Sequence, residues 1–155
     1  MPPTRTVRLI LGDQLNERHA WFYTPDDSVL YVLMEVRQET DYVRHHIQKV
    51  AAFFAAMRAF AQVLSDKGHR VAYLKLGDPE NRQNVADNLS RIIEKEGARR
   101  FEYLAPDEYR LDRQLRKIAA ALGTDRQVFD TEHFLTGREE VGRFFAGKKT
   151  FRMES

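Results

Sequence analysis

The stretch that decides the fold runs from Leu33 to Leu76 and reads LMEVRQETDYVRHHIQKVAAFFAAMRAFAQVLSDKGHRVAYLKL. It has the pattern of a buried strand's end, a short acidic elbow, one long helix and a second strand. A strand, helix and strand joined by short connections form a right-handed crossover in which the two strands are parallel. We therefore expect this stretch to organise a parallel α/β sheet.

The long helix is predicted from the spacing of its apolar residues. They recur at alternating steps of four and three, which places them on one stripe at about 100° per residue. They are Val43, Ile47, Val50, Phe54, Met57, Ala61 and Leu64. Thr40 or Asp41 can cap the start of the helix, and Gly68 tolerates the left-handed conformation that often follows its end. We expect the apolar stripe to face the core.

Strand and helix patterns alternate through the rest of the chain. With the two strands of the stretch above included, strands are expected at 7–11, 28–34, 70–76, 101–104 and 127–129, and helices besides the long one at 83–96, 110–122 and 139–145. This order predicts a doubly wound, mostly parallel five-stranded sheet with helices on both faces, a Rossmann-like or flavodoxin-like three-layer α/β/α fold.

Composition narrows the class of protein. The 155 residues are 43% hydrophobic and suffice for one domain with a core, while a net charge of +2 argues neither for nor against nucleic acid. The absence of cysteine excludes disulfides and thiolate metal sites built from this chain alone. No obvious leader occurs, and no run approaches the roughly 18 apolar residues of a membrane span, so we expect a cytoplasmic protein without membrane contact.

Polar residues follow three of the predicted strands, at Gly12-Asp13, Glu35 and Asp107. Residues after parallel strands line the ligand crevice of such sheets, and Gly12 would let a ligand approach the backbone. Two simpler interpretations stay open: GDQLN as a polar turn, and the acids of the elbow as solvated or capping residues. His45 and His46 point about 100° apart on a helix, so we predict no zinc site there.

Three stretches together resemble a known family. LILGDQL at 9–15, the pattern of acids, aromatics and paired histidines at 35–64, and PDEYRL at 106–111 are similar to the amino-terminal domain of bacterial deoxyribodipyrimidine photolyase-related proteins. These form the iron–sulfur branch of the photolyase and cryptochrome superfamily. The family usually has Trp where this chain has Tyr109. The resemblance covers nearly the whole chain.

The resemblance implies a longer parent similar to DNA photolyases, which repair ultraviolet pyrimidine photoproducts with light, or to related cryptochromes. A carboxy-terminal helical domain would hold FAD and a 4Fe-4S cluster and would be the partner of this domain, with damaged DNA as the parent's substrate. Residues 1–145 would form the antenna domain, binding 6,7-dimethyl-8-ribityllumazine, and 146–155 would begin the bridge. The isolated domain would have no catalytic residues, and self-association is expected through an apolar patch at Phe144, Phe145 and Phe151.

The resemblance also implies the residues of the antenna pocket. Carried over position by position, they are Leu11, Gly12, Asp13, Glu35, Val36, Glu39, Tyr42 and Phe53. Glu39 would accept from a ring N–H or ribityl hydroxyl, while Tyr42 and Phe53 would wall the planar ring. Phe53 stands where the family often has a smaller aliphatic residue. Two other functions stay open: a flavodoxin-like nucleotide module, although no glycine-rich phosphate loop occurs, and an interaction domain with a vestigial pocket.

Overall fold

The computed structural model describes residues 3–37 and 45–148, and every structural statement below concerns these residues. Five parallel strands form one sheet in the order β3-β2-β1-β4-β5. They are β1 (Thr6–Leu9), β2 (Val29–Met34), β3 (Arg70–Leu74), β4 (Arg100–Leu104) and β5 (Asp125–Phe129). The doubly wound fold is confirmed, and each predicted strand lies within two residues of its expected limits.

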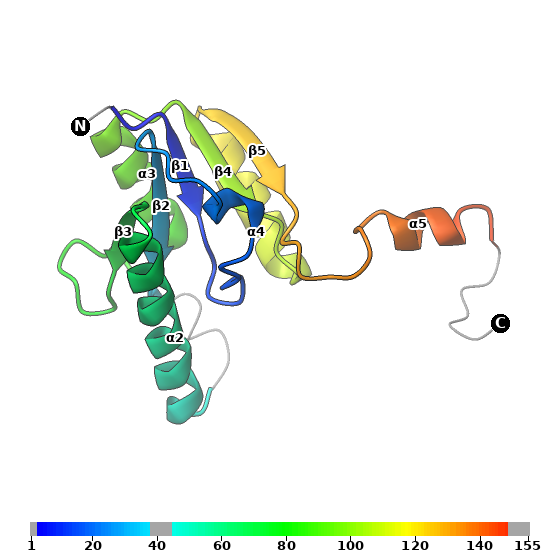
Figure 1. The fold of residues 1–155 in the computed structure, drawn as a ribbon, viewed down its shortest axis with the longest axis horizontal. Helices are drawn as coiled ribbons and strands as arrows, with labels where there is room; N and C mark the ends of the chain where they lie inside the picture. Colours follow the sequence, from blue (N-terminus) through cyan, green and yellow to red (C-terminus); the bar gives the residue numbers. More distant parts are fainter. Residues whose placement is uncertain (1–2, 38–44, 149–155) are drawn as a thin grey trace.

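The helices cover the two faces of the sheet (Figure 1). The helices on the sheet are α2 (Ile47–Asp66), α3 (Val85–Glu96) and α4 (Tyr109–Ala121), with a short 3-10 helix, η1 (Ala20–Phe22), between β1 and β2; a further helix, α5 (Glu140–Phe145), follows β5. One core cluster packs α3 and α4 against one face, where Leu89 and Leu115 are fully buried. The other packs α2 and η1 against the opposite face around Tyr31 and Leu64.

Helix α2 begins later than the sequence predicted. Its N-cap is His46, whose Nδ1 accepts a hydrogen bond from the Gln48 amide at 3.2 Å. The cap residues expected at Thr40 and Asp41, and Val43 of the stripe, lie outside the described residues. At the other end, Gly68 has the predicted left-handed conformation, with φ of +88°.

The apolar stripe of α2 is only partly core. Met57, Ala61 and Leu64 are buried as expected, together with Phe60, but none of residues 45–56 is buried. The prediction was wrong for Ile47, which is 74% exposed. The reason is visible in Figure 1, because the first half of α2 projects past the edge of the sheet and has no strand beneath it.

Helix α2 also corrects an expectation about apolar runs. Its 20 residues are long and apolar enough to cross a membrane by length and composition. The core helix of a soluble protein has the same properties, so the finding has little weight by itself.

Helix α5 stands apart from the sheet (Figure 1). It contains no buried residue, and Val141 and Phe144 are 60% and 62% exposed, while Phe145 is partly buried. Phe151, the third member of the expected apolar patch, lies outside the described residues.

Candidate functional site

A cavity of about 340 Å³ lies at the carboxyl edge of the sheet. The connection after β1 leads to β2 on one side while β4 lies on the other, so the loops diverge here, as at the ligand crevices of doubly wound sheets. The sheet contributes residues 9–13, Met34 and Val36, and the start of α4 contributes Glu108 and Leu111. The remaining wall is the projecting half of α2, with His45, Lys49, Val50, Phe53, Phe54 and Met57.

Gly12 lines the cavity and lies close to side chains of α2. A β-carbon at this position would lie 2.3 Å from Cε1 of Phe53 and 2.8 Å from Sδ of Met57. The glycine therefore lets α2 side chains approach the backbone of the β1 loop, at the position where the sequence predicts the approach of a ligand. Phe53 remains 42% exposed, so its ring covers Gly12 and also forms part of the cavity wall.

The other sheet-side residues combine apolar and acidic character. Val36 is almost fully buried and Leu11 is half-buried, while Asp13 is exposed at the rim. Desolvation raises the pKa of the Asp13 carboxyl, and its own backbone hydrogen bond opposes this shift. The nearby carboxylates of Asp107 and Glu108 also raise it. The rim therefore presents an acid that accepts a hydrogen bond when ionised and donates one when protonated.

Glu35 does not line the cavity. Its carboxylate is fully buried and accepts hydrogen bonds from Arg58 at 2.6 and 2.9 Å, from the Tyr73 hydroxyl at 2.7 Å and from the Leu76 amide at 2.8 Å. Burial alone would raise the pKa of Glu35, but these donors outweigh it and hold the pKa below its ordinary value. Among the described residues, the contacts of this carboxylate are all with groups of the fold itself, so Glu35 is not one of the proposed ligand contacts.

The structure brings together Leu11, Gly12, Asp13, Val36 and Phe53 from the predicted pocket. Glu39 and Tyr42 lie outside the described residues, so their place at the site stays a prediction.

Several lining residues were missed from the sequence. Lys49 precedes Phe53 by four residues and shares its helix face, a spacing that could have identified it. Glu108 follows Asp107 in a loop already expected at this edge. Met34 and Leu111 gave no such signal, because buried residues that reach a cavity have the same pattern as those that do not.

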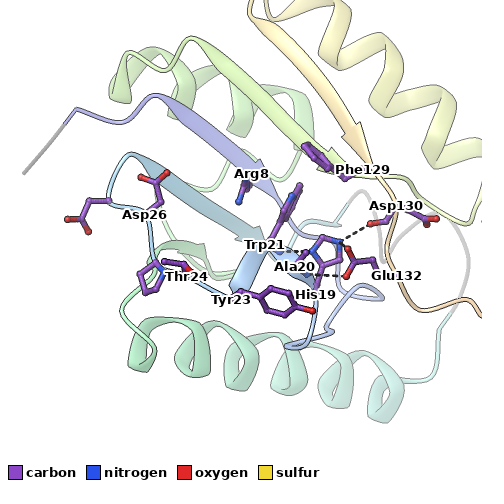
Figure 2. Close-up of a pocket in the computed structure, with 12 residues that line it drawn as sticks. Arg8, His19, Ala20, Trp21, Tyr23, Thr24, Asp26, Phe129, Asp130 and Glu132 are labelled. Carbon is purple, nitrogen blue, oxygen red and sulfur yellow. Dashed lines mark hydrogen bonds and ion pairs between the residues drawn. The ribbon is translucent and has the colours of Figure 1, made fainter.

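A second, more open depression of about 690 Å³ lies beside β1 and β5 (Figure 2). Arg8 and Trp21 are among the residues that line it, and the Arg8 guanidinium carbon lies 4.6 Å from the centre of the indole ring. Arg8 donates to Glu102 at 2.7 Å and to the Tyr31 hydroxyl at 2.9 Å. The guanidinium is therefore held by the sheet itself.

The wall of this depression is also internally bonded (Figure 2). His19 lies 2.8 Å from the Asp130 carbonyl through Nε2 and accepts from the Trp21 amide through Nδ1. Glu132 has a left-handed φ of +60° and accepts from the Ala20 amide at 3.1 Å. These bonds fasten the η1 loop to the segment after β5, so we place the candidate site in the cavity at the carboxyl edge.

Comparison with known proteins adds an independent result. The family described as deoxyribodipyrimidine photo-lyase-related protein matches residues 8–155. The chain belongs to this family. The resemblance carried by residues 9–15, 35–64 and 106–111 is thereby confirmed. A (6-4) photolyase of Agrobacterium fabrum is 34% identical to this photolyase-related chain over 149 residues. The match covers 94% of this chain but 29% of that photolyase, so the chain spans less than a third of its relative.

Proposed function

We propose that this photolyase-related domain binds a light-harvesting chromophore, 6,7-dimethyl-8-ribityllumazine, in the cavity at the carboxyl edge. The observation that carries the proposal is the cavity itself, which lies at the switch point of the sheet and combines apolar walls with a polar rim. Its volume of about 340 Å³ falls within the roughly 300–1,000 Å³ of small-molecule sites.

The lining residues suit a planar, polar-edged ring system. Val36, Phe53 and Met57 offer apolar surface on two sides, and burial of apolar area drives such binding. Asp13 and Lys49 offer an acceptor and a donor at the rim for ring N–H, carbonyl and hydroxyl groups. When bound, the chromophore would absorb light and pass the excitation energy to a second pigment.

The activity of the longer parent is part of the same proposal. Family membership and the (6-4) photolyase relative support a parent that repairs pyrimidine photoproducts in DNA with light. FAD and a 4Fe-4S cluster would belong to its carboxy-terminal domain. This chain alone would carry no repair activity.

Titration of the purified chain with the lumazine, followed by ligand fluorescence, tests the binding proposal. Val50→Glu places a charge in the cavity and is expected to weaken binding at least tenfold, because a buried unpaired charge is unfavourable. Ile47→Glu is the matched control, since this residue lies on the same helix but outside the cavity lining and is 74% exposed. Absence of saturable binding by the unmodified chain would refute the proposal.

A second function is favoured by one observation. The ring of Phe53 fills the space above Gly12, as expected if the cavity were vestigial and the domain only packed against a partner domain. In that case the unmodified chain would bind no lumazine, and Phe53→Ala, which opens that space, would not restore binding.

A further inference from the structure

The ion pair between Glu35 and Arg58 lies where α2 leaves the sheet. Glu35 follows the last residue of β2, and its carboxylate receives two hydrogen bonds from the Arg58 guanidinium. The same carboxylate also accepts hydrogen bonds from the Tyr73 hydroxyl on β3 and from the Leu76 amide just beyond this strand. One fully buried group thus ties three parts of the fold to a single point.

Arg58 is adjacent in sequence to the cavity wall. Met57 lines the cavity, and Phe53 lies a little over one turn earlier on the same helix. Toward the N-terminus of Met57 no described residue of α2 is buried, so the projecting half has few contacts that fix its direction. The position of Phe53 over Gly12 therefore depends on how α2 is held at its last anchored turn.

We propose that Glu35 and Arg58 are positioning residues that set the rotation and slide of α2, and thereby the shape of the chromophore cavity. The pair suits this role because two parallel hydrogen bonds between a planar guanidinium and a carboxylate fix orientation as well as distance. A lysine at the same place would supply a point charge without the fork geometry. This inference rests on the proposed function for its binding readout but not for its structural one.

The backbone of Glu35 is held by hydrogen bonds as well. The Glu35 amide donates to the Leu74 carbonyl at 2.9 Å, and the Glu35 carbonyl accepts from the Asn81 side chain at 2.7 Å. Backbone and side chain of Glu35 are thus both fixed by β3 and the loop that follows it. Arg58 contributes the connection from this fixed group to α2.

The test compares Arg58→Ala and Arg58→Lys with Lys67→Ala in the 155-residue chain. Lys67 forms an exposed ion pair with Glu17 beyond the far end of α2 and serves as the matched control. Two properties are measured: hydrogen exchange of the amides of residues 47–56 without ligand, and lumazine affinity together with the absorption maximum of the bound chromophore. Loss of a charge far from the cavity should change neither.

We expect Arg58→Ala to accelerate exchange in 47–56 at least tenfold, to weaken lumazine binding about tenfold and to shift the absorption maximum, with Arg58→Lys intermediate. Unchanged exchange in both Arg58 variants would overturn the inference. Should Arg58→Ala prove unfolded, the folded Arg58→Lys variant decides the matter by the same two measurements. If the unmodified chain binds no lumazine while exchange responds as expected, the proposed function fails and the positioning role stands.

Discussion

The two halves of α2 have the same apolar periodicity, but one half packs against the sheet and the other does not. From Met57 onward the stripe is buried against β2 and β3, and Leu64 is inaccessible to solvent. Before Met57 the stripe continues, but the sheet has ended, and the residues line a cavity or face solvent. The comparison teaches that periodicity identifies an apolar face but not what covers it. Where the cover is missing, that face is available to a ligand.

The largest effect on stability is expected in the buried half of α2. Leu64→Ala removes a fully buried side chain and is expected to lower the free energy of unfolding by about 2–5 kcal/mol. Ile47→Ala, in the projecting half, should change it by less than about 0.5 kcal/mol. Urea unfolding of the two variants measures the difference, and similar losses would show that the first half of α2 is packed in solution.

A second prediction concerns Glu39, which precedes α2 in the sequence. Under the proposed function, Glu39→Gln should weaken lumazine binding roughly tenfold or more, because a hydrogen bond to a charged acceptor contributes about 1.5–3 kcal/mol. A capping acid near a helix start would contribute only about 0.3–1 kcal/mol, and to stability alone. Fluorescence titration distinguishes the two, and equal affinities would remove Glu39 from the site.

A third prediction concerns the contact that shapes the cavity. Gly12→Ala places a methyl group against Phe53 and Met57, whose side chains must then move outward. We expect a loss of about 1 kcal/mol in stability, at the low end for overpacking because Phe53 is partly exposed, and, under the proposed function, an altered lumazine affinity. Gly77→Ala is the control, since an added β-carbon there meets no atom of the described residues within 4 Å. Equal behaviour of both variants would contradict the packing described here.

The smallest expected effect is a pH dependence of stability that comes from His69, which follows the buried half of α2. His69 is buried between the rings of Phe22 and Tyr31, and desolvation lowers its pKa, with the charges of Lys67 and Arg8 acting in the same direction. The unfolded chain then binds the proton first, so stability should fall as pH decreases below about 6.5.

Urea unfolding between pH 7.5 and 5.5 measures this dependence, with His69→Leu as the comparison. The variant is expected to lose less stability over that range than the unmodified chain. Parallel curves would show that His69 does not contribute.

The fold was predictable because its signals are local. Alternating strands and helices predicted the parallel sheet, and Gly68 predicted where α2 ends. The start of α2 could not be predicted in the same way. Its cap is His46, which acts through a ring nitrogen, whereas Thr40 and Asp41 have the usual capping side chains. Ile47 was wrongly predicted to be buried for a different reason. Its burial depends on the length of the neighbouring strands, which the sequence of the helix does not reveal.

The candidate site was partly predictable. Asp13, Val36 and Phe53 came from family resemblance together with their places after strands or on the flank of the helix. The role of Glu35 could not be found in this way, because Arg58 and Tyr73 lie 23 and 38 residues away and no spacing rule connects them. The contact of Phe53 with Gly12 likewise depends on the angle at which α2 crosses the sheet.

Trp21 gives the molecule a built-in optical probe. It is the chain's only tryptophan, is 6% exposed and is not among the residues that line the cavity. An indole shielded from water emits at shorter wavelength than one in solvent, so unfolding should shift its emission to the red. Under the proposed function, folding and chromophore binding could therefore be followed in the same sample by tryptophan emission and by ligand fluorescence, without any label.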